Sequence, residues 1–437
     1  MYSNLLFSTL VSDCDSLARP RPHKAGDDSS NMAAGAAASG CGCGWALFDP
    51  CAIMLGDSEH HHAPTAAASL TSNGLGIRVS LRLAPPPAAS YVQVSTDDLL
   101  YGGEPTVVAA DGDLLRIRMV VVVPVPGESR SHYPYNIFVY RAHPERPSLL
   151  LLPLIPDEWQ WIGCYGRHSG IVRGAAGEEF LAVDLQRSDG MVSEFLRFAS
   201  AAAGQWELRQ LRLVLRDPTP GADLELRCWQ DDAVFSSGEL VCWADYHKGV
   251  LLCDVAAGDP DLRFVPFPGL DVWRDFSNGR GGAPDRFRAA AIGVGGVLRF
   301  VDVDDGRFRH AGKSGCTTVT TWALTTPPET AVAAGWEEEH KLQLADLWER
   351  PEYRCSPLPR RTPEYPVFDR DEAHVLHFVL RESYRSTEQW MVTVDMAEGS
   401  LRSYEMYQNA IGEEPRLRTH VRNSPLIGSE ICRYVSP

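Results

Sequence analysis

Two short stretches near the N-terminus hold side chains that could bind a metal ion. Cys41 and Cys43 offer thiolates, and the histidine tract 60–62 offers imidazoles. Structural zinc sites space their cysteines as C-x2-C, and here only one residue separates the pair. Both stretches also lie in sequence of low complexity. We therefore interpret them as incidental composition and expect no bound metal.

An acidic stretch and a glycine-rich stretch resemble ligand-binding loops. Asp302-Val303-Asp304-Asp305-Gly306 has the carboxylates of a calcium loop. An EF-hand loop needs Gly at position six and Glu at position twelve, where this stretch has Gly at position five and Lys313. Residues 293–296, GVGG, carry glycines, but a strand-like run follows them in place of a helix. The first stretch is interpreted as a tight turn, with Asp305-Gly306 as the turn pair.

Cys242, Asp245 and His247 are close enough in sequence to suggest a cysteine nucleophile with a histidine base. Their neighbourhood has the pattern of a hairpin turn, which does not require the two side chains to face each other. The sequence contains no G-x-S-x-G, P-loop or H-E-x-x-H motif. We therefore predict no catalytic residue, no cofactor and a protein that is not an enzyme.

The elements that position these residues have the pattern of strands. The stretch Gly238–Pro268, GELVCWADYHKGVLLCDVAAGDPDLRFVPFP, contains apolar runs at 240–243, 250–255 and 262–267. Each run is too short for a helix and is rich in β-branched or aromatic residues. The turns between them carry residues that accept positive φ or preset a bend. The stretch is predicted to be an antiparallel meander.

Similar meanders recur along the chain. The other predicted strands are 77–83 and 91–94; 114–123, 137–140 and 149–154; 180–185, 195–198 and 206–215; 287–292, as an extension of the central meander; 297–303, 317–324 and 342–348; and 375–380, 390–396 and 401–407. Three of the units share an apolar–Asp–apolar motif before a turn, at residues 183–185, 253–255 and 394–396. This repetition is typical of propeller blades.

These patterns predict an all-β fold of repeated antiparallel meanders, an irregular β-propeller of five or six blades. A single meander has one apolar face that it cannot bury alone, whereas blades in a ring cover one another and leave few exposed edges. Two β-sandwich domains are the alternative, since they also give short strands and turn signals. The recurring apolar–Asp–apolar motif and the lack of one clear linker between residues 77 and 407 favour the propeller.

Composition divides the chain into three parts. Residues 1–44 are dense in Ala, Gly, Ser and Pro and are predicted to form a disordered leader. Residues 45–410 are predicted to form the β-repeat domain, with a flexible insert at 56–76. Residues 411–437 are a C-terminal tail that offers a closing strand to the first blade.

Charge and hydropathy restrict the partners and the location. The chain has 57 acidic and 41 basic residues, a net charge of -16, and a field of this sign repels phosphate backbones. No apolar run approaches the roughly 20 residues that span a bilayer. We therefore expect neither nucleic acid nor a membrane as a partner. Scattered cysteines indicate an intracellular protein of the cytoplasm or nucleus, and Asp13 and Asp15 weigh against an organelle transit peptide at Arg19 and Arg21.

The central meander resembles the signature of a plant family built on domain of unknown function 1618, which is expanded in grasses. The segments RVSLRLAPPPAASYVQV, IFVYRAHPERPSLLLLP, TTWAL, LQLADLW and WMVTVDMAEGSLRSY resemble other parts of the same family. The resemblance covers residues 45–410. The signature residues, for which the resemblance implies a structural role, are Trp243, Asp245, Leu251, Leu252, Cys253, Asp254, Pro260, Phe264, Pro266 and Pro268.

The central segment is also similar to blades of F-box-associated and kelch-type propellers, and this likeness implies recognition of another protein. Nothing before Trp45 has the pattern of a helical F-box. The unknown-function family offers no catalytic motif to carry over. We therefore expect a non-enzymatic protein–protein interaction domain. The alternative is an enzyme or small-molecule binder that uses the propeller channel, which requires ionisable residues that converge at one end of the channel.

Overall fold

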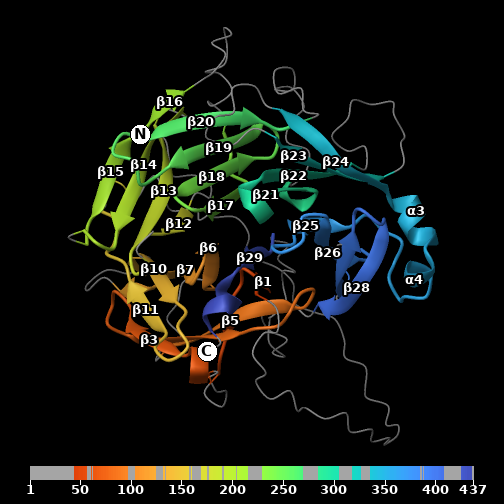
Figure 1. The fold of residues 1–437 in the computed structure, drawn as a ribbon. Coiled ribbons are helices and arrows are strands. Elements are labelled where there is room, and N and C mark those ends of the chain that lie inside the picture. The colour runs from red at the N-terminus through yellow and green to blue at the C-terminus, as the bar shows by residue number, and fades with distance from the viewer. Residues whose placement is uncertain are drawn as a thin grey trace, which may run out of the picture. The chain divides into compact units, whose positions relative to one another are not determined.

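The chain folds into six large β-sheets that surround a common axis (Figure 1). The computed structural model describes residues 44–56, 61, 63–96, 104–124, 131–132, 134–156, 159, 169–174, 177–188, 191–202, 204–214, 229–268, 284–304, 317–325, 335–383, 386, 388–407 and 425–435. The predicted leader, apart from Gly44, lies outside these residues. So do Cys41, Cys43, the Asp305-Gly306 pair and residues 411–424 of the tail.

Each sheet is one blade, and we number the blades from 1 to 6 along the chain. Blade 1 contains β29 (Ile427–Ser429), β1 (Ala46–Phe48), β5 (Ala89–Thr96), β4 (Gly76–Arg82) and β3 (Ala67–Leu70), with β2 (Ile53–Met54) beside β5. Blade 2 contains β6 (Thr106–Asp111), β7 (Leu114–Val120), β10 (Tyr135–Arg141) and β11 (Ser148–Leu151). Blade 3 contains β12 (Ser169–Arg173), β13 (Phe180–Ser188), β14 (Met191–Ala199) and β15 (Trp206–Gln210).

In blades 4 to 6 the four main strands are antiparallel to their neighbours and are named from the axis outward. Blade 4 contains β17 (Ala233–Ser237), β18 (Leu240–Asp245), β19 (Gly249–Asp254) and β20 (Asp261–Pro266), with β16 (Arg212–Val214) parallel to β20. Blade 5 contains β21 (Arg288–Ile292), β22 (Leu298–Asp304), β23 (Thr318–Leu324) and β24 (Trp336–Gln343). Blade 6 contains β25 (Glu364–Phe368), β26 (Val375–Arg381), β27 (Gln389–Asp395) and β28 (Ser400–Tyr407).

The shorter elements lie between or beside the blades. They are β8 (Val123–Pro124) and β9 (Ser131–His132), which form a two-stranded ribbon, the helices α3 (Leu344–Glu349) and α4 (Pro351–Arg354), and the 3-10 turns η1 (Ala63–Thr65), η2 (Pro284–Arg286), η3 (Val294–Gly296) and η4 (Ile431–Tyr434). In the described part of the chain, no helix is long and apolar enough to cross a membrane.

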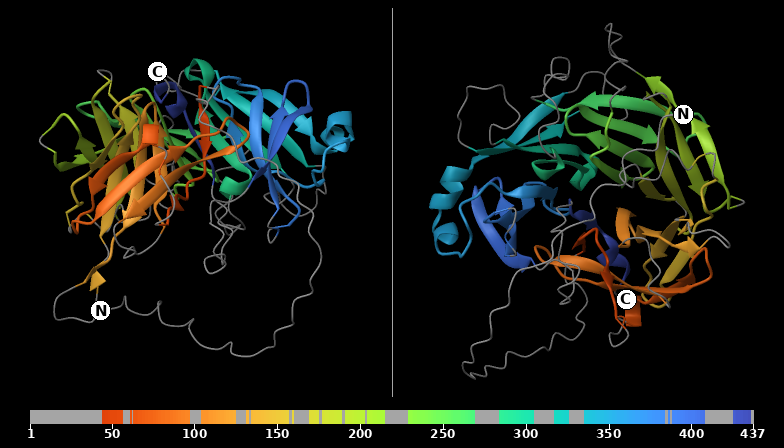
Figure 2. Two further views of the ribbon diagram at one scale, coloured as in Figure 1. Left: turned by 90° about the horizontal axis from the view of Figure 1, so that it is seen from below. Right: turned by 180° about the vertical axis from the view of Figure 1, so that it is seen from behind.

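The blades close into a ring. The innermost strands β29, β6, β12, β17, β21 and β25 contact one another in this order, and β25 returns to β29. Figure 1 looks along the axis, with these strands around the centre, and Figure 2 shows the ring from the edge and from behind. The predicted propeller is therefore confirmed, with six blades, and the two-sandwich alternative is excluded.

Both ends of the described chain meet in blade 1. Strand β1 pairs antiparallel with β29, Leu47 opposite Gly428, and parallel with β5 on its other side. Ile431 and Cys432 of η4 pack into the same buried cluster as Phe48. The tail thus supplies the innermost strand of blade 1, and the ring has no gap at this blade.

Six clusters of buried apolar side chains hold the ring together, one between each pair of neighbouring blades. In β18, Val241 and Trp243 face blade 3, whereas Cys242 and Ala244 face blade 5. Successive side chains of a strand point to opposite faces, and here both faces are covered. This is why the strand sequence LVCWA is apolar at every position instead of at alternate ones.

Polar contacts between blades repeat at equivalent places. The indole Nε1 of Trp206, at the start of β15, donates to the carbonyl of Pro153 in blade 2 at 2.8 Å. Trp336, at the start of β24, donates in the same way to Pro266 in blade 4 at 2.8 Å. Both tryptophans therefore tie the outermost strand of a blade to the blade before it.

One buried ion pair also joins two blades. Arg116 of β7 contacts Asp184 of β13 at 2.6 Å, and both side chains are 1% exposed. The same guanidinium donates to the carbonyls of Gly170 and Val183, and the Ser169 hydroxyl donates to the Asp184 carboxylate. The hydrogen bonds that surround the pair offset part of the cost of removing two charges from water.

The structure corrects three of the predicted elements. Residues 342–348 are the end of β24 followed by helix α3, because the run LQLADLW buries Leu344 and Leu347 at helical spacing. Residues 287–292 belong to blade 5 as its innermost strand β21, and do not extend the central meander. The insert at 56–76, expected to be flexible, contains η1 and the strand β3.

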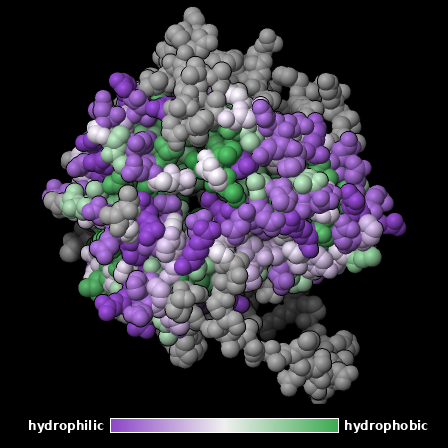
Figure 3. All heavy atoms as spheres, in the orientation of Figure 1, coloured by the Kyte–Doolittle hydropathy of each residue, from purple (hydrophilic) through white to green (hydrophobic). Residues whose placement is uncertain are grey.

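The surface of the ring is mainly polar. Figure 3 shows hydrophilic residues over most of the face seen in Figure 1, with hydrophobic residues gathered near the strands labelled β18 and β21. Among the described residues, no group of three or more His, Cys, Asp and Glu side chains could hold a metal ion. His61 instead contacts the hydroxyls of Ser80 and Ser95, at 2.8 and 2.7 Å.

Candidate functional site

Turns from several blades converge on a cavity at one end of the propeller axis. The cavity has a volume of about 420 Å³, and we call it the channel-mouth cavity. Its lining comes from the ends of the innermost strands and from η4: residues 110–112 of blade 2, 236–238 of blade 4, 292–295 of blade 5, 370–371 of blade 6, and 428–430 with Arg433 at the C-terminal segment. Residues more than 300 positions apart in sequence therefore share one site.

Glycines make the two tightest of these turns possible. Gly112 between β6 and β7 and Gly238 between β17 and β18 have φ values of +53° and +60°. Side chains larger than hydrogen are strained in this region of backbone space. Only residues 112–113 and 238–239 connect the strands of these two hairpins, and both glycines line the cavity.

Arg370 is the most constrained charge in the cavity. Its Nη1 donates to the carbonyl of Ile292 at 3.2 Å and its Nη2 to the carbonyl of Gly428 at 3.1 Å. The guanidinium therefore bridges blades 5, 6 and 1. A Cβ at position 428 would lie 3.2 Å from the Arg370 Nε, so the glycine allows this close approach. Burial lowers the pKa of Arg370, which means that the surroundings do not fully compensate its charge.

Asp111 supplies an anion from blade 2. The main-chain N–H of Arg173 in blade 3 donates to its Oδ2 at 2.7 Å. Burial raises the pKa of Asp111 to about 6, although the Arg173 N–H and the Arg370 charge act in the opposite direction. The Glu430 charge adds to the rise. Asp111 therefore changes its protonation state close to neutral pH.

The rim of the cavity carries a second arginine with two carboxylates. Arg433 contacts Asp371 at 3.0 Å and Glu430 at 3.3 Å. All three side chains are more than a third exposed, at 45%, 49% and 37% for Arg433, Asp371 and Glu430. These pairs are therefore accessible to solvent and can exchange partners at low cost.

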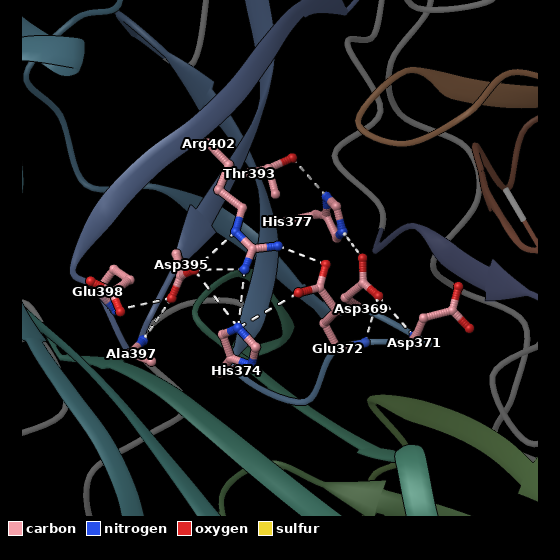
Figure 4. A network of polar contacts seen from close by, with 10 residues as sticks. All are labelled: Asp369, Asp371, Glu372, His374, His377, Thr393, Asp395, Ala397, Glu398 and Arg402. Atoms are coloured by element: carbon pink, nitrogen blue, oxygen red, sulfur yellow. Dashed lines mark hydrogen bonds and ion pairs between the residues drawn. The ribbon is translucent and has the colours of Figure 1, made fainter. Parts of the chain in front are cut away.

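The turn that carries Arg370 and Asp371 is shaped by a buried hydrogen-bonded chain (Figure 4). Thr393 Oγ1 lies 3.1 Å from His377 Nδ1, and His377 Nε2 lies 3.0 Å from Asp369 Oδ2. The other oxygen of Asp369 accepts the N–H groups of residues 371 and 372, at 2.8 and 3.0 Å. These bonds hold the pKa of Asp369 below its usual value, against the opposing effect of burial.

The hydrogen-bonded series Thr393–His377–Asp369 has the residue types of a hydroxyl nucleophile with a histidine base, but its position is that of a structural support. Thr393 and His377 are 6% and 2% exposed, and they lie on neighbouring strands of blade 6. The Trp45 ring packs edge-on against the imidazole at 5.3 Å between centroids. A substrate cannot reach the threonine hydroxyl in this position. These hydrogen bonds instead fix the β25–β26 turn, which carries Arg370.

A second network supports the neighbouring β27–β28 turn (Figure 4). Asp395 Oδ1 accepts the N–H groups of Ala397 and Glu398, at 3.0 Å each, and Oδ2 accepts Nη2 of Arg402 at 2.6 Å. Despite burial, these bonds hold the pKa of Asp395 below its usual value. Arg402 also contacts Glu372 at 2.6 Å and thereby links the two turns of blade 6.

The recurring apolar–Asp–apolar motif places an aspartate that supports a turn in two of its three occurrences. In the equivalent turn of blade 4, Asp254 Oδ1 accepts the N–H groups of Ala256 and Ala257, at 3.0 and 3.1 Å. Asp395 repeats this arrangement in blade 6. Asp184 does not, because it lies within β13 and pairs with Arg116. The apolar–Asp–apolar motif thus marks a turn at the end of the third strand in blades 4 and 6. The remaining occurrence, at residues 183–185, does not have this role.

The signature residues lie in blade 4 or directly after it. Trp243, Leu251, Leu252, Cys253 and Pro260 are buried, Phe264, Pro266 and Pro268 are half-buried, and Asp245 and Asp254 shape the turns after β18 and β19. None of the ten lines the channel-mouth cavity among its described residues. Their positions are those of core and turn residues.

The grouping of Cys242, Asp245 and His247 is a hairpin turn, as the sequence predicts. Asp245 Oδ1 accepts the His247 N–H at 3.0 Å, and its main-chain carbonyl accepts the Lys248 N–H at 2.8 Å. Cys242 is fully buried toward blade 5, and burial raises the pKa of its thiol far above the usual range. A thiol in this state is a poor nucleophile. The strand predicted after the GVGG turn is also present, as β22.

Arg370, Asp111, Glu430 and Arg433 were not found as site residues by sequence reasoning. Asp111 ends β6, Arg370 and Glu430 follow β25 and β29, and Arg433 lies in η4; charged residues are common at such places on any protein surface. The one usable signal is the position of the first three at the end of the innermost strand of a blade, and that position becomes visible only when the blades are in register.

The fold and the cavity define a β-propeller with a charged channel mouth. Residues 243–377 match the family model described as Protein of unknown function (DUF1618). The match extends from the second strand of blade 4 to the second strand of blade 6, and it confirms the resemblance seen in the central meander. No curated protein matches the chain.

Several solved structures are similar to this chain. The β-propeller domain of Cps50 (Swd1) from Myceliophteria thermophila has 9% sequence identity and a TM-score of 0.37, with 83% of this chain and 89% of that chain covered. Sqt1 from Saccharomyces cerevisiae has 9% identity and a TM-score of 0.33, with 84% and 88% covered. An α-L-arabinanase from Penicillium chrysogenum has 9% identity and a TM-score of 0.30, with 82% and 85% covered.

Proposed function

We propose that the chain is a non-enzymatic binding domain that docks another protein on the face where the channel-mouth cavity opens. The observation that carries the proposal is the convergence of turns from blades 2, 4, 5 and 6 with the C-terminal segment around one polar cavity. Loops held on a rigid scaffold are the usual place for recognition. The ring supplies the scaffold, and the turns supply the contacts.

The turns on this face are preorganised. Asp369, Asp395 and Asp254 each accept two main-chain N–H groups of the turn that follows them. A turn that is already fixed loses little conformational entropy when a partner binds, so more of the contact energy contributes to affinity. This arrangement supports a docking surface.

The described lining supports binding more than catalysis. It contains three serines, Ser236, Ser237 and Ser429, but no histidine, cysteine or lysine that would activate them. His377, which contacts the Thr393 hydroxyl, is buried in the scaffold of blade 6, and neither it nor His61 is among the described lining residues. The charged groups that line the cavity are suited to hold a ligand by ion pairs.

A small-molecule binder or enzyme that uses the channel is the second candidate, and two observations favour it. The cavity volume of about 420 Å³ is within the range of small-ligand pockets. The raised pKa of Asp111, about 6, also provides a carboxyl that can exchange a proton near neutral pH. This candidate predicts binding of a free small molecule in the absence of a protein partner.

Affinity capture from native tissue extract tests the proposal. The bait is the full chain, because strand β1 begins at Ala46 and shorter forms would lose it. Three baits are compared: wild type, Arg370→Gln, and the matched control Arg354→Gln, which changes an exposed arginine of α4. We expect a stoichiometric partner with wild type and Arg354→Gln, and its loss with Arg370→Gln. Equal retention by all three baits would place the docking surface elsewhere and contradict the proposal.

A further inference from the structure

We propose that the channel-mouth cavity binds a zwitterionic group, with the ligand carboxylate on Arg370 and the ligand cation beside Asp111 and Glu430. This inference rests on the proposed function, because it names the chemistry that the docking face recognises. It follows from the placement of the charges, from the donors that Arg370 has left, and from the kinds of side chain in the lining.

Arg370 provides the anion-binding side. A guanidinium has five N–H donors, and the structure uses two of them on the carbonyls of Ile292 and Gly428. Among the described residues, Arg370 forms no ion pair with a carboxylate, unlike Arg433 on the rim. The two carbonyls hold the guanidinium in place but leave its charge without a direct counterion. A ligand carboxylate would supply that counterion through charge-assisted hydrogen bonds.

Asp111 and Glu430 provide the cation-binding side. Asp111 accepts one main-chain N–H and contacts no cationic side chain among the described residues. Glu430 pairs with Arg433 at the rim, and its side chain is 37% exposed and therefore accessible to a ligand. A ligand ammonium placed between them would lower the pKa of Asp111, since an adjacent cation favours the ionised carboxyl. Arg370 and Asp111 act on each other's charge without forming a direct ion pair, and a zwitterion would give each of them a direct partner of opposite charge.

The balance of charges argues against ligands of a single sign. The described lining has two arginines, Arg370 and Arg433, and three carboxylates, Asp111, Asp371 and Glu430. A multiply charged anion such as a phosphate would be repelled by the carboxylates. A polycation would be repelled by Arg370, which is fixed in place. A ligand that carries both charges avoids both penalties.

The lining also argues against sugars and nucleobases. Its described residues contain no aromatic side chain, and flat rings are usually held by stacking on aromatic groups. The apolar contribution is limited to Ala110, Ile292 and Val294. Recognition in this cavity therefore depends on ion pairs and hydrogen bonds, which are the interactions that a zwitterion offers.

The paired charges have two possible sources. One is a free small molecule with ammonium and carboxylate groups, and the other is a segment of the partner protein with neighbouring basic and acidic side chains. Both sources present the same chemistry to Arg370 and Asp111. The free termini of a peptide imitate the small molecule, and blocking them removes both charges. The side chains of a Glu-Lys peptide imitate the protein segment, and their charges remain when the termini are blocked.

Isothermal titration calorimetry with peptides of fixed size separates these cases. The first set is alanyl-alanine with both ends free, with only the amine acetylated, with only the carboxyl amidated, and with both ends blocked. The second set is doubly blocked Glu-Lys and doubly blocked Gln-Gln. We expect free alanyl-alanine, blocked Glu-Lys or both to bind at least about tenfold more tightly than the peptides with one charge or none.

Variants assign each charge to its side chain. Arg370→Gln should weaken the zwitterionic peptide by about tenfold or more, whereas Arg354→Gln in α4 should leave its affinity unchanged. Asp111→Asn should remove the advantage of the free peptide over its acetylated form. Thermal unfolding of each variant checks the fold, and if Arg370→Gln does not fold, Glu430→Gln at the rim provides the same test for the cation side.

The inference is overturned if no peptide binds, if the fully blocked peptides bind as well as the zwitterion, or if Arg370→Gln behaves like Arg354→Gln. Failure here is distinguishable from failure of the proposed function. If affinity capture shows an Arg370-dependent partner but no zwitterionic peptide binds, only the ligand chemistry is wrong. If a zwitterionic peptide binds but no partner depends on Arg370, the protein-docking proposal is wrong and the small-molecule alternative holds.

Discussion

Replacement of Asp111 by asparagine should change how stability depends on pH. The side chain lies half-buried in the cavity, where burial raises its pKa from 3.8 to about 6. The folded protein therefore holds the proton more tightly than the unfolded chain does. It follows that the wild type loses stability as the pH rises from about 4 to about 6, and that the full loss is present above this window. Asparagine does not ionise, so the variant lacks this loss.

The size of the effect follows from the pKa difference. At about 1.4 kcal/mol for each pKa unit, the change from 3.8 to about 6 corresponds to about 3 kcal/mol. The free energy of unfolding of Asp111→Asn, minus that of the wild type, should therefore rise by about 3 kcal/mol between pH 3.5 and pH 7.5. The Arg173 N–H keeps an acceptor, because the amide oxygen replaces Oδ2.

Urea unfolding at several pH values measures this difference. Asp346→Asn is the matched control, since Asp346 is exposed in α3 and lies away from the cavity. Effects of other carboxylates cancel when each variant is compared with the wild type at the same pH. A difference between Asp111→Asn and wild type that stays flat from pH 3.5 to pH 7.5 would refute the reasoning about Asp111.

Three further predictions concern the ring. Arg116→Met leaves the Asp184 carboxylate buried without its partner and should lower the free energy of unfolding by about 3–5 kcal/mol. The control is Arg360→Ala, which removes the exposed ion pair of Arg360 with Glu349 and should cost about 1 kcal/mol or less. Equal losses of the two variants in urea unfolding would contradict this. Trp206→Phe removes an inter-blade hydrogen bond and should cost about 1–3 kcal/mol, and no measurable loss would argue against that contact. Deletion of residues 425–437 removes β29, uncovers the edge of β1 and should cause aggregation. Size-exclusion chromatography detects the aggregates. A monodisperse, fully stable truncated protein would show that β29 does not close the ring.

The sequence was sufficient for the fold because the strand signal is local. Runs such as 240–243 and 250–255 are short, β-branched and bounded by turn residues, and both are strands in blade 4. The errors have physical causes. Leu344 and Leu347 give an apolar run that alternation alone cannot distinguish from a strand. The assignment of residues 287–292 to a blade depends on long-range pairing with β22, which no local pattern contains.

The site was not predictable in the same way. Asp111 and Arg370 are 259 positions apart in the sequence, and they meet only because six blades bring the ends of β6 and β25 to the same axis. A closed ring with a different blade count would bring other turns together. The buried chain of Thr393, His377 and Asp369 shows the opposite problem, because its residue types suggest catalysis and its position in the structure shows support of a turn.

Hydrogen–deuterium exchange of the wild-type chain, with and without the protein that co-purifies with it, tests the central claim most directly. The claim is that turns far apart in sequence form one binding face at the channel mouth. It predicts slower exchange at residues 110–112, 236–238, 292–295 and 370–371 and at the 428–433 segment together, with the opposite ends of the same blades unchanged. Protection confined to the opposite ends of the blades, or to one blade alone, would contradict the account.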